Sequence, residues 1–347
     1  DKGDSFIIPK DKVVDYNTEE TLTYAQNVYN YILTSRYVSG SYGNGFGDAS
    51  SIHLTYGNNI VWGLYEYYLL TSNDTWFVQL ENYLDFLITE QQANGEIPWI
   101  TFNVDTGEKS GNDQGVSFLP FIIGYLMLGN ASYIEASEKA ANFYKANNKD
   151  DSYYSDVQTL GLLKLYEVTG NSTYRSWLND AIEYYFDLLW KDLEGFTSCV
   201  SAGSHIIMAL SYVLLDLGDI TAYPIKTTLK NTLLKNIRAR TLDSGQAINL
   251  NGKYPLYPCH QEFSGNAFML YLEYLIFQGE FDRRYFRVPL ENFAWVEGNN
   301  ELGYDFFNNT SGITERKIYL VDGVPTVDIS EILYDQSTTL RFLTRLS

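Results

Sequence analysis

Apolar residues recur at every third or fourth position along almost the whole chain of 347 residues. This spacing puts them on one face of an α-helix, and it predicts twelve amphipathic helices. They cover residues 19–36, 53–71, 74–92, 113–128, 131–147, 154–169, 172–191, 203–217, 222–240, 262–278, 281–296 and 329–345. Strand-like alternation occurs only at 317–328, where two apolar runs flank Asp322-Gly323 and predict a hairpin. The pattern therefore predicts an all-α protein of six helical hairpins with one small β-hairpin.

A recurring phrase separates the two helices of a predicted hairpin. It is clearest in Val168-Thr-Gly-Asn-Ser-Thr-Tyr174, where Gly ends one helix and Asn begins the next. Gly readily adopts the left-handed conformation that ends a helix, and Asn, Asp or Ser caps a helix N-terminus. Related phrases occur at 70–76, 128–133, 217–219 and 277–281. The glycines at positions 129, 170, 218 and 279 are 41, 48 and 61 residues apart, which indicates a helical-hairpin repeat with insertions of variable length.

The connections between the predicted helices alternate in length. The junctions just described span two to four residues, and the alternate connections are mostly long: 36–52, 93–112, 148–153, 192–202, 241–261 and 297–328. In an antiparallel array, alternate connections lie at opposite ends. We call these the short-junction end and the long-loop end. Since binding and catalytic residues are commonly carried by loops, we expect a functional site at the long-loop end.

Composition fits a folded, acidic body. The chain has 24 Lys and Arg residues against 43 Asp and Glu residues, a net charge of −19, and is 16% aromatic. A disordered acidic chain would be poor in aromatics, so we expect one folded domain at 19–347 after an N-terminal extension at 1–18. The shortage of basic residues argues against nucleic acid as a partner. No apolar run reaches the roughly 18–20 residues of a membrane span, since 116–128 and 206–217 are too short.

Six hairpins, long loops entering every second helix and the phrase Leu165-Tyr-Glu-Val-Thr-Gly-Asn-Ser-Thr-Tyr-Arg175 resemble the six-hairpin glycosidases, whose fold is the (α/α)6 toroid. The resemblance covers residues 19–345. It implies that the helices entered through the long loops form an inner ring, and that their N-termini line a catalytic cleft. It also implies an oligo- or polysaccharide as the substrate.

Two carboxylates open adjacent helices of this expected inner ring. The segments Gly111-Asn-Asp113-Gln-Gly-Val-Ser and Asp156-Val-Gln-Thr are similar to those of unsaturated glucuronyl and rhamnogalacturonyl hydrolases. That similarity implies that Asp156 protonates or activates while Asp113 assists. The chain departs from those families at Ala202-Gly-Ser-His-Ile, where they carry a Trp-x-Arg-Gly segment. Alternatively, both Asp residues are ordinary helix N-caps.

Further candidates lie before or within the first turns of the expected inner helices. Glu262 is a third possible acid, with His260 and His205 as further catalytic candidates. The residues that we expect to contact substrate are Trp99, Tyr154, Tyr257, Gln114 and His53. A His–Glu–Tyr neighbourhood would also suit a polysaccharide lyase or uronate epimerase. No local histidine spacing favours a metal site, so we expect no cofactor.

The cysteines and glycosylation sequons bear on the compartment. Cys199 and Cys259 are either two buried thiols or one disulfide, depending on whether the protein is exported. The Asn-x-Ser/Thr sequons begin at Asn73, Asn130, Asn171, Asn308 and Asn309. Together with a first residue that is Asp1 and not Met, they lead us to expect an exported, extracellular or cell-surface glycoprotein.

The sequence thus leads us to expect a secreted glycoside hydrolase that uses paired carboxylates. A lyase or epimerase with His/Tyr chemistry is one alternative, and a non-catalytic surface or filament glycoprotein on a toroid scaffold is another. The acidic charge favours neutral glycans over uronates, because it repels polyanions. The sequence leaves the oligomeric state open.

Overall fold

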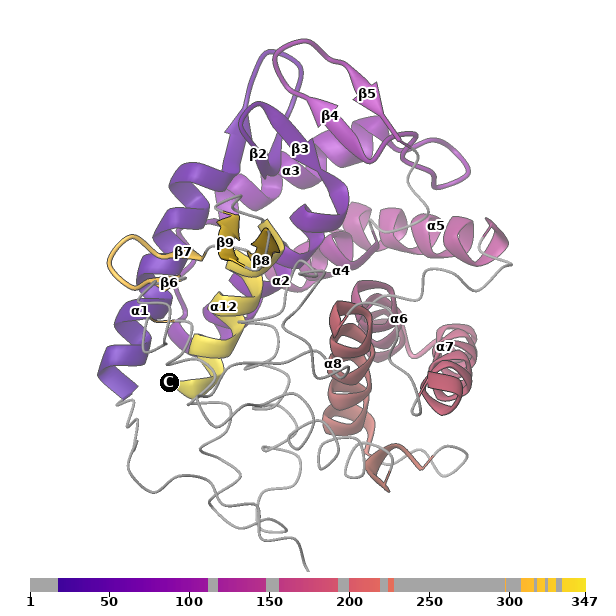
Figure 1. Ribbon diagram of the computed structural model, residues 1–347. Helices are drawn as coiled ribbons and strands as arrows, with labels where there is room; N and C mark the ends of the chain where they lie inside the picture. Colours follow the sequence, from indigo (N-terminus) through magenta and orange to yellow (C-terminus); the bar gives the residue numbers. More distant parts are fainter. Residues whose placement is uncertain are drawn as a thin grey trace, which may run out of the picture.

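The computed structural model describes residues 18–111, 118–147, 156–192, 200–218, 224–227, 297, 307–314, 317–321, 324–328 and 333–347. Its helices are α1 (Thr18–Tyr31), continued by the π-helical turn η1 (Ile32–Arg36), α2 (Leu54–Thr71), α3 (Phe77–Glu90), α4 (Phe118–Leu128), α5 (Ala131–Asn147), α6 (Asp156–Thr169), α7 (Ser172–Asp192), α8 (Val200–Leu217) and α12 (Leu333–Leu346) (Figure 1). These bounds closely follow the helices predicted there from apolar spacing. The predicted helices 222–240, 262–278 and 281–296 lie outside the described residues, apart from 224–227.

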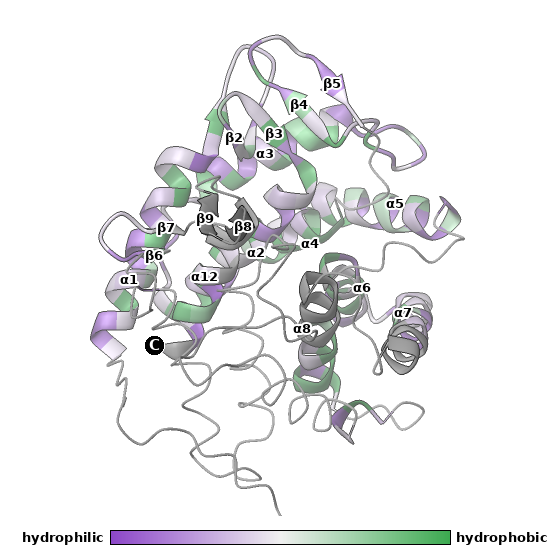
Figure 2. Ribbon diagram, viewed as in Figure 1, coloured by the Kyte–Doolittle hydropathy of each residue, from purple (hydrophilic) through white to green (hydrophobic). Residues whose placement is uncertain are grey.

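The helices form two layers of a ring. The inner helices α2, α4, α6 and α8 pack side by side in that order, and α12 packs against α2. The outer helices α3, α5 and α7 lie behind them, each packed on an inner neighbour. Helix α4 is apolar on all sides, as expected of a helix surrounded by protein, whereas α5 is polar on its outer face (Figure 2). The prediction of an all-α toroid is confirmed.

The short junctions have the geometry predicted from their sequence. Ser72, Gly129, Gly170 and Gly218 are left-handed, with φ of 56°, 69°, 66° and 72°. The N–H of each donates to the carbonyl four residues earlier. The Oδ1 atoms of Asn73, Asn130 and Asn171 accept from the N–H two residues later, at 3.2, 3.0 and 3.0 Å. The junctions at Gly129-Asn130 and Gly170-Asn171 therefore end one helix and cap the next, and Asn73 caps the turn that leads into α3.

The tyrosine that follows two of the junctions links successive outer helices. Tyr133 is fully buried, and its hydroxyl donates to Asp85 of α3 at 2.8 Å. Tyr174 is buried at the equivalent place, and its hydroxyl donates to Glu138 of α5 at 3.1 Å. The junction phrase thus fixes the spacing of the outer layer as well as the turn.

A five-stranded antiparallel sheet covers part of the long-loop end. Its strands, in spatial order, are β1 (Tyr37–Ser39), β2 (Asn44–Asp48), β3 (Ser51–His53), β4 (Thr101–Asn103) and β5 (Lys109–Ser110). The prediction that strands occur only at 317–328 was therefore wrong. The strands are two to five residues long, and β2 reads Asn-Gly-Phe-Gly-Asp, so they show no alternation that a sequence pattern could reveal.

The predicted β-hairpin is present. Strands β8 (Lys317–Val321) and β9 (Val324–Asp328) pair antiparallel from Lys317↔Asp328 to Val321↔Val324. A shorter pair, β6 (Phe307–Asn308) and β7 (Ile313–Thr314), precedes it. No helix in the described ranges is both long enough and apolar enough to cross a membrane.

Candidate functional site

The N-termini of the inner helices mark the candidate site. Consecutive inner helices are separated by one antiparallel outer helix, so they run parallel and start at the same, long-loop end. Asp156 is the first residue of α6, and His205 lies in the second turn of α8. The backbone therefore brings these two predicted residues to one end of the ring. A helix N-terminus stabilises a nearby carboxylate in its ionised form.

His53 lies at the same end, where β3 passes into α2. It is the N-cap residue of α2, and its ring stacks on Tyr56 with 4.1 Å between centroids and 23° between planes. Its Nδ1 atom is buried and accepts or donates no hydrogen bond within the described part of the chain. Burial lowers the pKa of His53 below its usual value. The lowered pKa keeps the imidazole neutral at neutral pH.

A buried arginine ties η1 to the sheet near this end. Arg36 is buried, and its Nη1 donates to Oδ1 of Asp48 at 2.7 Å. The Asp48 carboxylate is mostly exposed to solvent. This pair keeps a negative group at the surface of the long-loop end while anchoring the start of the sheet.

Trp99 does not reach the site. Its ring is fully buried against Phe86 and Phe102, and its Nε1 donates to Oε2 of Glu90 at 2.9 Å. The expectation that Trp99 stacks on a sugar was wrong. The connection that carries it, which reads as an open loop in the sequence, folds into β4 and β5 and has an aromatic core of its own.

Most other predicted site residues lie outside the described residues. These are Asp113, Gln114, Tyr154, Tyr257, His260, Glu262, Cys199 and Cys259, together with the side chains of Asp156 and His205. Among the described residues, no group of His, Cys, Asp and Glu could hold a metal ion.

The sequon asparagines are described. Asn130 and Asn171 directly precede α5 and α7 and cap them, whereas Asn73 caps the turn that leads into α3. In two of these sequons the Ser or Thr hydroxyl also donates to the Asn Oδ1: Thr75 to Asn73 at 2.8 Å and Ser132 to Asn130 at 2.9 Å. Capping alone therefore accounts for the recurrence of Asn-x-Ser/Thr at the junctions. Asn130, Asn171 and Asn308 are exposed, whereas Asn73 and Asn309 are partly buried.

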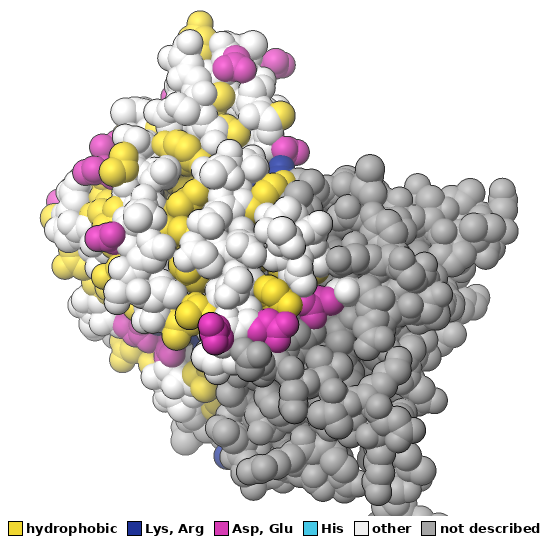
Figure 3. All heavy atoms as spheres, turned by 90° about the vertical axis from the view of Figure 1, so that its left-hand side faces the viewer, with side chains coloured by type: hydrophobic (Ala, Val, Ile, Leu, Met, Phe, Trp, Pro, Cys, Tyr) yellow, Lys and Arg dark blue, Asp and Glu magenta, His cyan; other side chains and the backbone are white. Residues whose placement is uncertain are grey.

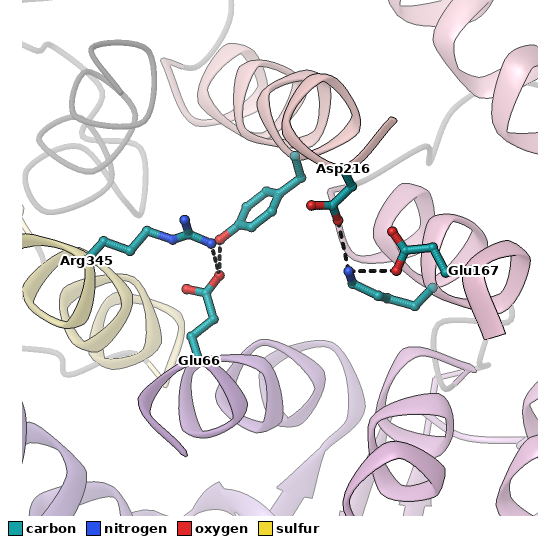
Figure 4. Close-up of polar contacts among 6 residues, drawn as sticks. Glu66, Glu167, Asp216 and Arg345 are labelled. Atoms are coloured by element: carbon teal, nitrogen blue, oxygen red, sulfur yellow. Dashed lines mark hydrogen bonds and ion pairs between the residues drawn. The ribbon is translucent and has the colours of Figure 1, made fainter. Parts of the chain in front are cut away.

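A charged network that the sequence did not reveal crosses the ring axis (Figure 4). Glu66 of α2 meets Tyr212 of α8, on the opposite side of the ring, and the Tyr212 hydroxyl donates to its Oε1. Arg345 of α12 donates to the same Oε1 at 2.7 Å. Arg341 of α12 donates to the Tyr212 hydroxyl at 2.9 Å, and its Nε lies 3.5 Å from Glu66 Oε2. Three inner helices thus share one hydrogen-bonded cluster.

The electrostatics of this cluster favour the ionised carboxylate. Burial alone would raise the pKa of Glu66, but Arg345 and Arg341 hold it below its usual value. Burial raises the pKa of Tyr212 to about 12. Beside the cluster, Lys164 of α6 donates to Asp216 of α8 at 2.8 Å and to Glu167 at 2.9 Å. These contacts brace α6 against α8 as Figure 4 shows.

The cluster joins α2, α8 and α12 toward their C-terminal, short-junction end. The Arg341 guanidinium lies 4.4 Å from the ring centroid of Trp62, and Trp62 packs on Tyr212 at 4.7 Å. All three side chains are buried. Glu66 lies thirteen residues after His53 along α2, about 20 Å at the rise of an α-helix. The cluster is therefore a floor across the axis, well separated from the N-terminal end.

One sequence signal could have pointed to this floor. Glu66 is the one charged residue in the mostly apolar and aromatic helix α2, and Arg341 and Arg345 repeat at i, i+4 in α12. A lone charge on a buried helix needs a partner of opposite charge. The pairing itself joins residues 279 positions apart and could not be read from local pattern.

The sequence matches no protein-family model, and no curated protein is similar to it. The fold matches solved structures over nearly the whole chain. A sugar epimerase from a ruminal bacterium has a TM-score of 0.69 at 12% identity, covering 94% of this chain and 98% of that chain. The family 9 endoglucanase J30 matches with a TM-score of 0.67 at 12% identity, covering 97% of this chain and 87% of that chain. A glycosyl hydrolase family 88 protein from Bacteroides vulgatus matches with a TM-score of 0.64 at 14% identity, covering 95% of this chain and 99% of that chain. A polysaccharide lyase matches as well. This chain therefore shares the (α/α)6 toroid fold of these proteins.

Proposed function

We propose that this protein is a carbohydrate-active enzyme, a glycoside hydrolase with its reaction centre at the N-termini of the inner helices. The observation that carries the proposal is the arrangement of the ring. Toward its short-junction end the buried side chains of Glu66, Tyr212 and Arg341 meet across the axis, and the starts of α2, α6 and α8 lie at the other end with His53, Asp156 and His205. Proteins that share this fold include hydrolases of glycans, which supports the choice of substrate class.

The proposed mechanism uses two carboxylates. Glycoside hydrolysis needs a proton donor for the leaving oxygen and a base or nucleophile on the other side of the bond. Asp156, at the start of α6, is stabilised as the anion by the helix dipole and so suits the base that activates water. Asp113 is the candidate partner, and the two groups should lie roughly 5–9.5 Å apart.

Substitution of these residues tests the proposal. We expect Asp156→Asn and Asp113→Asn each to lower kcat by at least about 100-fold on a neutral oligosaccharide that the wild type cleaves, measured as new reducing ends. Asp74→Asn, which changes an exposed acid at the short-junction end between α2 and α3, is the matched control and should keep full activity. Unchanged kcat in both variants, with thermal unfolding as in the wild type, would exclude this pair as the catalytic groups.

The second candidate is a polysaccharide lyase or epimerase with His/Tyr chemistry. The observation that favours it is the neutral His53 ring stacked on Tyr56, because a neutral imidazole can take a proton from a sugar carbon. Product analysis separates the reactions. A lyase forms an unsaturated, ultraviolet-absorbing end, an epimerase forms an isomer without new reducing ends, and a hydrolase forms new reducing ends alone.

We also propose that the protein is exported and carries N-linked glycans at some of its sequons. Asn130 and Asn171 are exposed at the short-junction end, so glycans there would leave the long-loop end open. Mass spectrometry of peptides from the native protein tests this. A third hypothesis, a non-catalytic surface glycoprotein on the same scaffold, predicts these glycans but no turnover of any sugar.

A further inference from the structure

Tyr42 is an exposed aromatic ring at the tip of the β1–β2 hairpin. Its side chain is 59% exposed, and it is the one aromatic among the exposed large hydrophobic side chains of the described residues. The others are the aliphatic residues Leu22, Leu69, Leu70, Val78, Leu126 and Leu215. Since the aromatic core of the sheet is complete without it, core packing does not explain an aromatic at this position.

The hairpin tip is held rigidly. The Tyr42 N–H donates to the Val104 carbonyl at 2.9 Å, which ties the tip to the β4–β5 turn. Gly40 packs so closely on the same carbonyl that a Cβ there would lie 2.5 Å from its oxygen. The N–H of Gly40 donates to the Gly43 carbonyl at 3.0 Å and closes the tip itself. The ring is therefore fixed to the sheet through its backbone before any ligand arrives, which limits the entropy lost on binding.

Gly107 lies beside the Tyr42 ring and, because it has no side chain, does not cover it. Gly107 is left-handed, with φ of 72°, and a Cβ at this position would lie 3.1 Å from Cδ1 of Tyr42. Any other residue at position 107 would thus be both strained and in contact with the ring. A tyrosine supported on one side and free on the other presents an apolar face with a polar rim. Sugar rings bind such faces through their C–H groups while their hydroxyls find polar partners nearby.

The groups around the tip suit a neutral sugar. Ser41 and Thr106 are exposed and offer hydroxyl groups. Asp105 and Glu108, also exposed on the β4–β5 turn, offer acceptors but would repel a uronate. Lys109, which follows Glu108, is paired with Glu90 at 2.6 Å, and Arg36, before β1, is paired with Asp48 at 2.7 Å. In Figure 3, acidic side chains stand beside hydrophobic ones at the top of the molecule, over the sheet.

We propose that Tyr42 is a stacking platform for a neutral polysaccharide, on the sheet and outside the reaction centre. The choice of ligand class rests on the proposed function. A site at the tip of the sheet contacts only chains long enough to extend from the inner-helix N-termini across the sheet. It therefore adds affinity for polymers and none for short oligosaccharides.

Affinity electrophoresis tests the platform directly. Native gels containing hydroxyethylcellulose, soluble starch, galactomannan or polygalacturonate are run with the wild type and with Tyr42→Ala, Tyr42→Phe and Val78→Ala. Val78 is equally exposed but lies at the short-junction end, so Val78→Ala controls for the loss of exposed apolar surface. We expect at least one neutral polymer to retard the wild type, with an apparent Kd at least fivefold weaker for Tyr42→Ala and within twofold for Tyr42→Phe and Val78→Ala. Equal retardation of Tyr42→Ala and wild type, or no retardation by any neutral polymer, would overturn the proposal.

Kinetics distinguish failure of the platform from failure of the proposed function. We expect Tyr42→Ala to raise KM for the retarding polymer and to leave kcat on a short oligosaccharide unchanged. Retardation that depends on Tyr42, without turnover of any sugar, would support the platform and contradict the enzyme. Turnover of the polymer with the same KM in Tyr42→Ala and wild type would contradict the platform and support the enzyme.

Discussion

Glu66→Gln removes the negative charge at the centre of the axial cluster while keeping the size of the side chain. Both Arg341 and Arg345 then lose the carboxylate that they face. Arg345 is partly exposed and can turn toward water, but Arg341 is fully buried and keeps its charge inside the protein. Breaking a buried ion pair by removing one partner costs about 3–5 kcal/mol. Because one of the two arginines can relax, we expect a loss of about 3 kcal/mol in the free energy of unfolding.

The pH dependence gives an independent check. The pKa of Glu66 is lowered in the folded protein, so its contribution to stability is fully present above its unfolded pKa of about 4.5. That contribution is lost as pH falls through the lower, folded pKa. The difference in stability between wild type and Glu66→Gln should therefore be constant between pH 5 and 8, and should shrink at more acidic pH.

Urea denaturation followed by circular dichroism measures both quantities. Glu167→Gln is the matched control, because Glu167 is partly exposed and Lys164 keeps its bond to Asp216, so we expect a loss of about 0–1 kcal/mol. The double variant Glu66→Leu/Arg341→Met should recover most of the lost stability, since apolar residues can replace a buried pair. A loss below about 1 kcal/mol in Glu66→Gln would refute the idea that the cluster braces the ring.

Three further predictions concern the junctions and the site. Gly170→Ala places a side chain on a left-handed residue with open space around it. Backbone strain alone should therefore lower the free energy of urea unfolding by about 1 kcal/mol. No loss would contradict the C-cap geometry. Tyr133→Phe removes the hydroxyl that donates to Asp85. Because the acceptor is charged, the loss in the free energy of urea unfolding should be about 1.5–3 kcal/mol. Adding Asp85→Asn to Tyr133→Phe should lower it little further, and a large further loss would contradict this pairing. The NMR titration of His53 should give a pKa below 6.5, and stability should fall as pH drops through that folded pKa; a value above 6.5 would contradict its burial.

The helices could be predicted from sequence because their signals are local. Helix α5 begins and ends where its cap at Asn130 and its apolar spacing predict, and Gly170 ends α6 as expected. The sheet was missed because its strands are too short to show a period and because β3 and β4 come from different loops. The site residues were harder to predict than the helices. Trp99, for example, is buried against Phe102 of β4, so its position could not be predicted without the sheet.

The contact between α12 and α2 has a consequence for the order in which the chain is made. Glu66 leaves the ribosome some 275 residues before Arg341 and 279 before Arg345. Until then the first hairpin carries a carboxylate on the face that becomes buried, without the arginines that keep it ionised there. A nascent chain can form its hairpins one by one, but Glu66 meets both arginines only after α12 is synthesised. The lone charge in α2 would thus keep the growing ring from closing on the wrong partner.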